Sequence, residues 1–210
     1  MSISPPVKSM RARPLERILR LVSPSELRTS LLFLATVAVT VTASLASAPG
    51  LLGFLGGGLA IAMVTIAAID WRRFIIPNWL NAVAFTLALV HAAVQEPSSY
   101  LAAVMTATLR GAAVALVFLA IRHGYALVRG RQGLGLGDVK LAAVAGAWLD
   151  WLVIPIAIEL AAFAALTAYL ARHVIFGRSI SPTNRLPFGT FFAPAIWLCW
   201  LLEIILFVSF

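Results

Sequence analysis

Charged residues and cysteine are both scarce in this chain. Only 11% of its 210 residues are charged and 61% are hydrophobic, with a mean hydropathy of +0.98. Soluble domains are about 25% charged, so the composition indicates an integral membrane protein with room for roughly six to eight spans. The single cysteine, Cys199, lies in an apolar run, which excludes an internal disulfide and a cysteine-cluster zinc site.

Acidic residues are fewer than basic ones, 8 against 16, which gives a net charge of +8. Such a charge invites a nucleic-acid interpretation. The basic residues, however, lie in short segments between apolar runs, which is typical of a membrane orientation signal. We therefore expect contact with membrane lipid and no nucleic-acid partner. His91, His123 and His173 lack metal-ligand spacing, so we expect neither a metal nor another cofactor.

Hydropathy predicts an all-α fold, a polytopic membrane helix bundle of about seven segments. These cover about 30–48, 51–69, 79–95, 101–121, 138–149, 152–172 and 189–209. The fifth is short for a span, at ~18 Å. Residues 30–210 would form the membrane domain. Residues 1–29 are a separate polar, basic segment in which 14–22 could lie on the membrane surface and Ser23 could cap a helix that starts at Pro24.

The distribution of Lys and Arg predicts a cytoplasmic N-terminus. With this orientation the cytoplasmic parts, 1–29, 70–78, 122–140 and 172–188, hold 6, 2, 4 and 3 basic residues, which are 15 of the 16. The outer loops hold none, as the positive-inside rule requires. Residues 1–48 could instead be a signal peptide, but their charged region is long and their apolar run is long enough to span.

Two of the rare acids, Asp70 and Asp138, stand at the ends of apolar segments, where a carboxylate is costly. The predicted orientation places both at the cytoplasmic boundary. Two carboxylates at one depth in a partly dry site cannot both ionise cheaply, so the pair can share a proton. One could then activate water while the other polarises a carbonyl. Alternatively, each Asp only caps a helix or pairs with a neighbour: Asp138 could stand at a helix N-terminus, and Arg72 or Arg73 could pair with Asp70.

Glycines precede the second aspartate, in the run Gly133-Leu-Gly135-Leu-Gly137-Asp138. Glycine permits close backbone approach and unusual φ values. We therefore expect that a substrate strand could lie against this loop.

Three motifs resemble the type IV prepilin peptidase family, the bacterial members of the GxGD aspartic proteases. They are Asp70 with Ile76-Pro77-Asn78, then Gly135-Leu-Gly137-Asp138-Val139-Lys140, then Pro187-Phe188-Gly189. The resemblance covers about 50–210. It implies that Asp70 and Asp138 are the catalytic pair, and that the site is shaped by Pro77, Asn78, Gly135, Gly137, Lys140, Pro187, Phe188 and Gly189.

The resemblance further implies a function. Such enzymes lie in the bacterial inner (cytoplasmic) membrane and cleave the basic leader of prepilin or pseudopilin precursors at the cytoplasmic face. Larger members carry a domain with paired cysteines that also N-methylates the product, and this chain resembles a peptidase-only member. Thr190 stands where many members have another Pro. Oligomeric state is not indicated.

Two other functions compete with a peptidase. An ion- or proton-coupled transporter would also use intramembrane acids, but near the midplane and often in repeated halves, and this chain has edge acids and no visible repeat. A catalytically inactive scaffold for pilus assembly would not need the intact aspartate pair.

Two further charges fall inside apolar segments. Arg110 and Glu159 lie at similar predicted depths, so we expect them to form an ion pair. The alternative is that Arg110 snorkels to the outer interface. Glu203 is expected near that interface.

Overall fold

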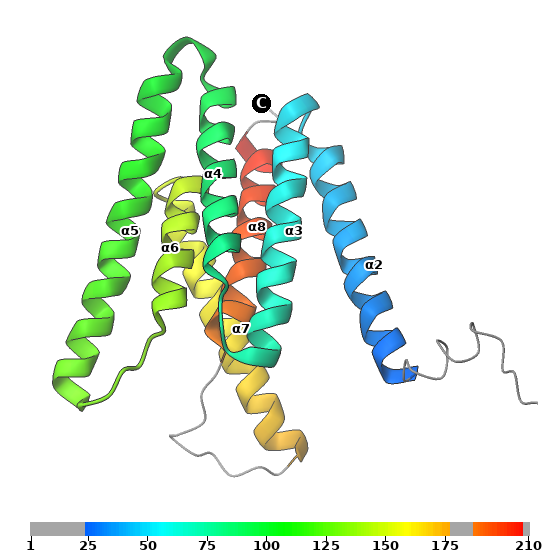
Figure 1. Ribbon diagram of the computed structural model, residues 1–210, viewed down its shortest axis with the longest axis vertical. Coiled ribbons are helices and arrows are strands. Elements are labelled where there is room, and N and C mark those ends of the chain that lie inside the picture. The colour runs from blue at the N-terminus through cyan, green and yellow to red at the C-terminus, as the bar shows by residue number, and fades with distance from the viewer. Residues whose placement is uncertain (1–23, 177–186, 208–210) are drawn as a thin grey trace, which may run out of the picture. The chain divides into compact units, whose positions relative to one another are not determined.

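The computed structural model describes residues 24–176 and 187–207 of the chain, and this part is all-α, as predicted, with no strand among its residues. The elements are α2 (Pro24–Ser47), α3 (Gly50–Arg73), α4 (Asn78–Gln95), the 3₁₀ turn η1 (Pro97–Ser99), α5 (Tyr100–Arg129), α6 (Leu136–Trp148), α7 (Val153–Phe176) and α8 (Phe188–Phe207) (Figure 1). The predicted surface helix at 14–22 and the cap at Ser23 lie outside the described residues.

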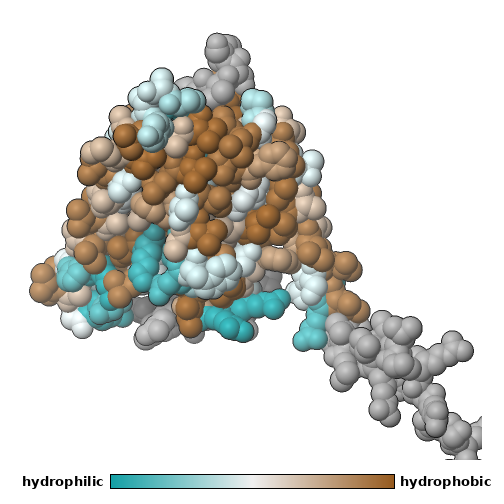
Figure 2. Space-filling view, turned by 45° about the horizontal axis from the view of Figure 1, so that its top comes forward, coloured by the Kyte–Doolittle hydropathy of each residue, from teal (hydrophilic) through white to brown (hydrophobic). Residues whose placement is uncertain are grey.

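Five of these helices are long and apolar enough to cross a membrane. They are Ser25–Ser47, Gly50–Arg73, Pro97–Arg129, Val153–Ala171 and Phe188–Leu206. The protein is therefore a multi-pass membrane protein. Neither α4 nor α6 belongs to this set, and α6 has only 13 residues. Figure 2 shows hydrophobic side chains across the middle of one face and strongly hydrophilic ones along its lower edge.

The chain divides between Ala35 and Thr36 into two compact units. The described part of the first is the beginning of α2, whose side chains are mostly exposed. The second holds all the elements that follow. Within it α3 packs against α4 and α8, α8 against α7, and α6 against α4 and α5. The short α6 is buried along most of its length, which explains why its residues are nearly all apolar or small.

Small residues allow close contact between helices α5 and α6. A Cβ added to Gly146 would lie 2.8 Å from the Arg110 carbonyl oxygen, and one on Gly111 would lie 2.8 Å from that of Ala143. Backbone therefore meets backbone, as is common between membrane helices.

Indole side chains fill the core between α4, α6 and α8. The Trp200 Nε1–H donates to His91 Nε2 at 3.2 Å, and the Trp148 Nε1–H donates to the Ala84 carbonyl at 2.9 Å. The His91 ring also lies 4.7 Å from that of Trp148, centroid to centroid. His91 thus packs as a core side chain whose polar atom has a partner.

The predicted ion pair between Arg110 and Glu159 is wrong. The Arg110 Nε–H donates to the Gly146 carbonyl at 2.7 Å, and its Nη1 lies 2.5 Å from Asp150 Oδ1. Glu159 is instead exposed on α7. Because α6 is so short, its turn into α7 brings Asp150 to the depth of Arg110, ~15 Å along α5. Arg110 therefore has no need to snorkel.

Candidate active site

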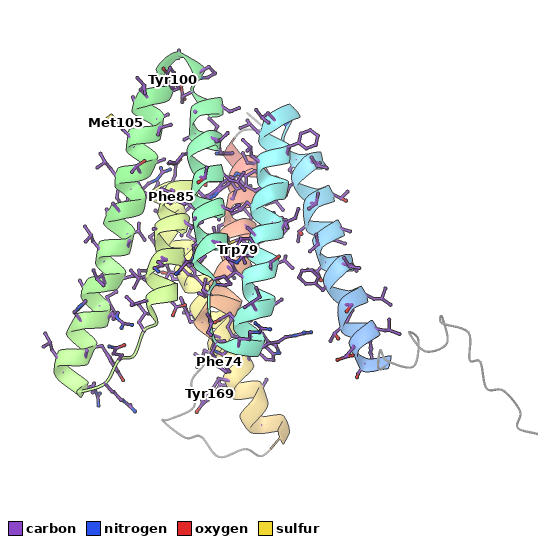
Figure 3. All side chains as sticks on the ribbon, viewed as in Figure 1. Phe74, Trp79, Phe85, Tyr100, Met105 and Tyr169 are labelled. Carbon is purple, nitrogen blue, oxygen red and sulfur yellow. The ribbon has the colours of Figure 1, made fainter. Side chains whose placement is uncertain are left out.

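The two aspartates lie at the same end of the second unit. Asp70 lies in the last turn of α3 and Asp138 in the first turn of α6. Figure 3 shows Phe74, which follows α3, at the lower end together with Tyr169 of α7, whereas Tyr100 marks the opposite end. We call the lower end the Asp end.

Asp70 is buried, with 5% of its surface exposed, and its carboxylate is held by the start of α8. Its Oδ2 accepts the Thr190 backbone N–H at 2.8 Å and the Thr190 hydroxyl at 3.2 Å. The motif Pro187-Phe188-Gly189 comes directly before Thr190. The third motif therefore places two hydrogen-bond donors at Asp70, the aspartate of the first motif. Sequence reasoning noted Thr190 only as a departure from the family and missed this contact. A buried carboxylate needs donors, but the sequence does not say which residue supplies them.

Asp138 is half-buried at the start of α6, which is not one of the five spanning helices. Its Oδ2 accepts the Gly135 N–H at 3.2 Å. Burial raises the pKa of this carboxyl to about 6; the Gly135 N–H lowers the pKa, and the negative charge of Asp70 raises it further. The two carboxyls therefore interact electrostatically. A group that exchanges its proton close to neutral pH is suited to acid–base chemistry.

Ile76 packs between the second and third motifs. A Cβ added to Gly137 would lie 3.0 Å from Ile76 Cβ, and one added to Gly189 would lie 2.6 Å from Ile76 Cδ1 and 3.0 Å from Asp70 Oδ2. Neither glycine has a positive φ, so close packing rather than backbone conformation calls for glycine at these two positions.

The glycine loop packs closely against neighbouring groups of the chain on the sides where side chains would project, while Gly133 and Gly135 are exposed elsewhere. These groups are Ile76 at Gly137, the Asp138 carboxylate at Gly135, and the Tyr125 ring at Gly133, 2.7 Å from the Cβ position. The glycines make room for the parts that position Asp138. That a substrate strand lies against the loop stays a prediction.

The remaining predicted residues join the first two motifs or pack beside the third. The Lys140 ammonium donates to Asn78 Oδ1 at 2.7 Å, which links α6 to the start of α4. Pro77 precedes α4 in extended conformation. Pro187 is buried, and the Phe188 ring lies 5.3 Å from that of Phe192. All of them lie at or beside the Asp end.

Two residues of α5 hold the glycine loop, and the sequence analysis did not identify them. The Arg122 guanidinium donates to the Leu134 carbonyl and to Gln132 Oε1, while the Tyr125 ring packs on Gly133. The predicted segment ended at residue 121, whereas α5 continues to Arg129 and ends at Gly130 with φ +65°. Hydropathy identifies only the apolar part of a helix. The polar extension of α5 beyond residue 121 therefore could not be predicted from it.

Fold and site together define a multi-pass helical membrane protein with paired aspartates at one end of its bundle. Residues 57–170 match the model of the Type IV leader peptidase family, and the chain belongs to this family. Among the described residues no cluster of three or more His, Cys, Asp or Glu could hold a metal ion.

Several curated proteins are similar to this chain. A prepilin leader peptidase/N-methyltransferase of Aeromonas hydrophila is 28% identical over 176 residues, 84% of this chain and 59% of that protein. A protein of the same name from Burkholderia pseudomallei (strain K96243) is 31% identical over 81% of this chain and 53% of its own. Leader peptidase HopD of Escherichia coli is 42% identical over 78 residues, which are 37% of this chain and 50% of that protein. The chain thus spans about half of these relatives, and no solved structure matches it significantly.

Proposed function

We propose that this protein is an aspartic endopeptidase with Asp70 and Asp138 as its catalytic pair. The observation that carries the proposal is that two carboxyl groups from different helices lie at the same end of the second unit, each held by a backbone N–H, with the charge of Asp70 raising the pKa of Asp138. Geometry and acid–base chemistry of this kind suit the activation of one water molecule.

In the proposed reaction the ionised carboxylate takes a proton from water as the water oxygen attacks the scissile carbonyl carbon. The protonated carboxyl gives its proton to the carbonyl oxygen, which yields a tetrahedral intermediate. The C–N bond then breaks as the leaving nitrogen accepts a proton from the first carboxyl and one hydroxyl of the intermediate gives its proton to the second carboxylate. This step releases a carboxylic acid and an amine and returns both side chains to their starting protonation states. No cofactor is needed for any of these steps.

The proposed substrates are prepilin-like precursors, cleaved at the cytoplasmic face of the inner membrane to remove a basic leader. Family membership and the names of the relatives support this choice. We further propose that the chain does not methylate the new N-terminus. The support is its single cysteine, since the resemblance ties methylation to a domain with paired cysteines.

The test is cleavage of a co-expressed prepilin by single Asn variants. Asp70→Asn and Asp138→Asn should each lower cleavage by at least about 100-fold, because an amide cannot transfer the proton. Glu96→Gln is the matched control, since it neutralises an exposed acid beside η1 at the opposite end. Full cleavage by either Asn variant would remove the assignment.

A further inference from the structure

An apolar groove opens along the second unit, with a volume of about 470 Å³. Its walls come from α2, α3, α7 and α8. The lining residues are almost all apolar, among them Met63, Val64, Leu160, Ala164, Pro194 and Leu198. The helices that form it are long enough to cross the membrane, so we place the groove at the level of the hydrocarbon core, where apolar segments lie.

One end of this groove lies beside the candidate active site. Thr190 and Ala67 both line the groove. Thr190 donates two hydrogen bonds to Asp70, and Ala67 lies one turn before Asp70 on α3. A chain that lay along the groove would therefore reach the residue that donates to the buried Asp70 carboxylate.

The groove wall also carries an unusual backbone carbonyl. Pro194 lies inside α8 and has no N–H, so the Thr190 carbonyl lacks its α-helical donor. Both residues line the groove. A peptide there could supply the missing donor, because the first four N–H groups of a helix have no partner within that helix.

We propose that this groove binds the apolar helical segment that follows the scissile bond of the precursor, with the start of that helix at Thr190. The inference rests on the proposed function and names the subsite for its membrane-embedded part. A lipid acyl chain would fit the apolar walls, but it offers no N–H to the Thr190 carbonyl. The start of a peptide helix can offer apolar side chains to the walls and a free N–H to the carbonyl.

The first experiment fills the groove. Ala164 is exposed on α7, so Ala164→Trp places a large ring in the groove without displacing the core. We expect the KM for the full precursor to rise at least tenfold. Cleavage of a soluble peptide with the same leader and scissile bond but no apolar segment should be unchanged. Leu116→Trp, at an exposed position of α5 outside the groove, is the control.

The outcomes separate the two proposals. If the unmodified protein does not cleave the precursor, the proposed function fails. If it cleaves, and Ala164→Trp has the same KM for the precursor as Leu116→Trp, the groove proposal is overturned. The same result is expected if lipid alone occupies the groove.

Cross-linking decides the question should Ala164→Trp fold poorly or the short peptide resist cleavage. In a Cys199→Ala, Asp70→Asn background, Leu198→Cys should form a disulfide with a cysteine in the precursor's apolar segment, whereas Leu116→Cys should not. Equal cross-linking at both positions, none at Leu198→Cys, or cross-linking only between two copies of this chain would overturn the proposal.

Discussion

Thr190 is the residue through which the last helix acts on Asp70. Its N–H and hydroxyl both reach one carboxylate oxygen, at 2.8 and 3.2 Å. Hydrogen bonds to charged groups contribute about 1.5–3 kcal/mol each. Proline at this position could supply neither bond. The threonine therefore supplies two donors to the Asp70 carboxylate.

Substitutions at Thr190 should lower the rate of cleavage in proportion to the number of hydrogen bonds to Asp70 that they remove. Thr190→Ser keeps both and should retain near-normal kcat. Thr190→Val loses the hydroxyl and should lower kcat about tenfold, and Thr190→Pro loses both and should lower it about a hundredfold. Thr190→Pro also removes the bond from the Thr190 N–H to the Pro187 carbonyl, at 3.2 Å, so its melting temperature should fall as well. Equal kcat for Thr190→Pro and the unmodified protein would contradict this role.

At the scale of elements, the end of α5 supports the start of α6. Arg122 donates to both a carbonyl and a side-chain amide of the glycine loop, and Tyr125 packs on Gly133. Asp138 follows this loop directly, so its position depends on a helix that contributes no acid to the site. Arginine suits this task because its planar fork reaches two acceptors at once.

Arg122→Lys should loosen the loop without unfolding the protein. Lysine keeps the charge but cannot hold both acceptors, so we expect kcat to fall about tenfold and proteolysis within residues 130–135 to accelerate. Arg129→Lys, at the exposed last residue of α5, is the matched control. Unchanged kcat together with unchanged proteolysis would show that Arg122 does not position Asp138.

At the scale of the whole molecule, hydropathy predicted much of the arrangement of helices along the chain. Seven segments and the all-α class follow from apolar runs, because a membrane helix must bury an uninterrupted apolar length. Contacts between distant elements were not predictable in the same way. Arg110 meets Asp150 because α6 is short and turns back at that depth, and Ile76 meets Gly137 and Gly189 because three elements converge. The pattern of apolar residues along one helix does not predict which residues of other helices it will contact.

The remaining prediction concerns which way the molecule faces. The Asp end holds Arg72, Arg73, Arg122, Arg129, Arg131 and Lys140, whereas residues 96–100 at the other end hold no Lys or Arg. The positive-inside rule therefore predicts a cytoplasmic Asp end. In a Cys199→Ala background, an impermeant thiol reagent added to spheroplasts should label Ser98→Cys at once and Arg131→Cys only after lysis. The reverse pattern would leave the fold intact but place Asp70 and Asp138 on the side away from a cytoplasmic leader. Such a result would exclude cleavage at the cytoplasmic face, whatever the chemistry of the pair.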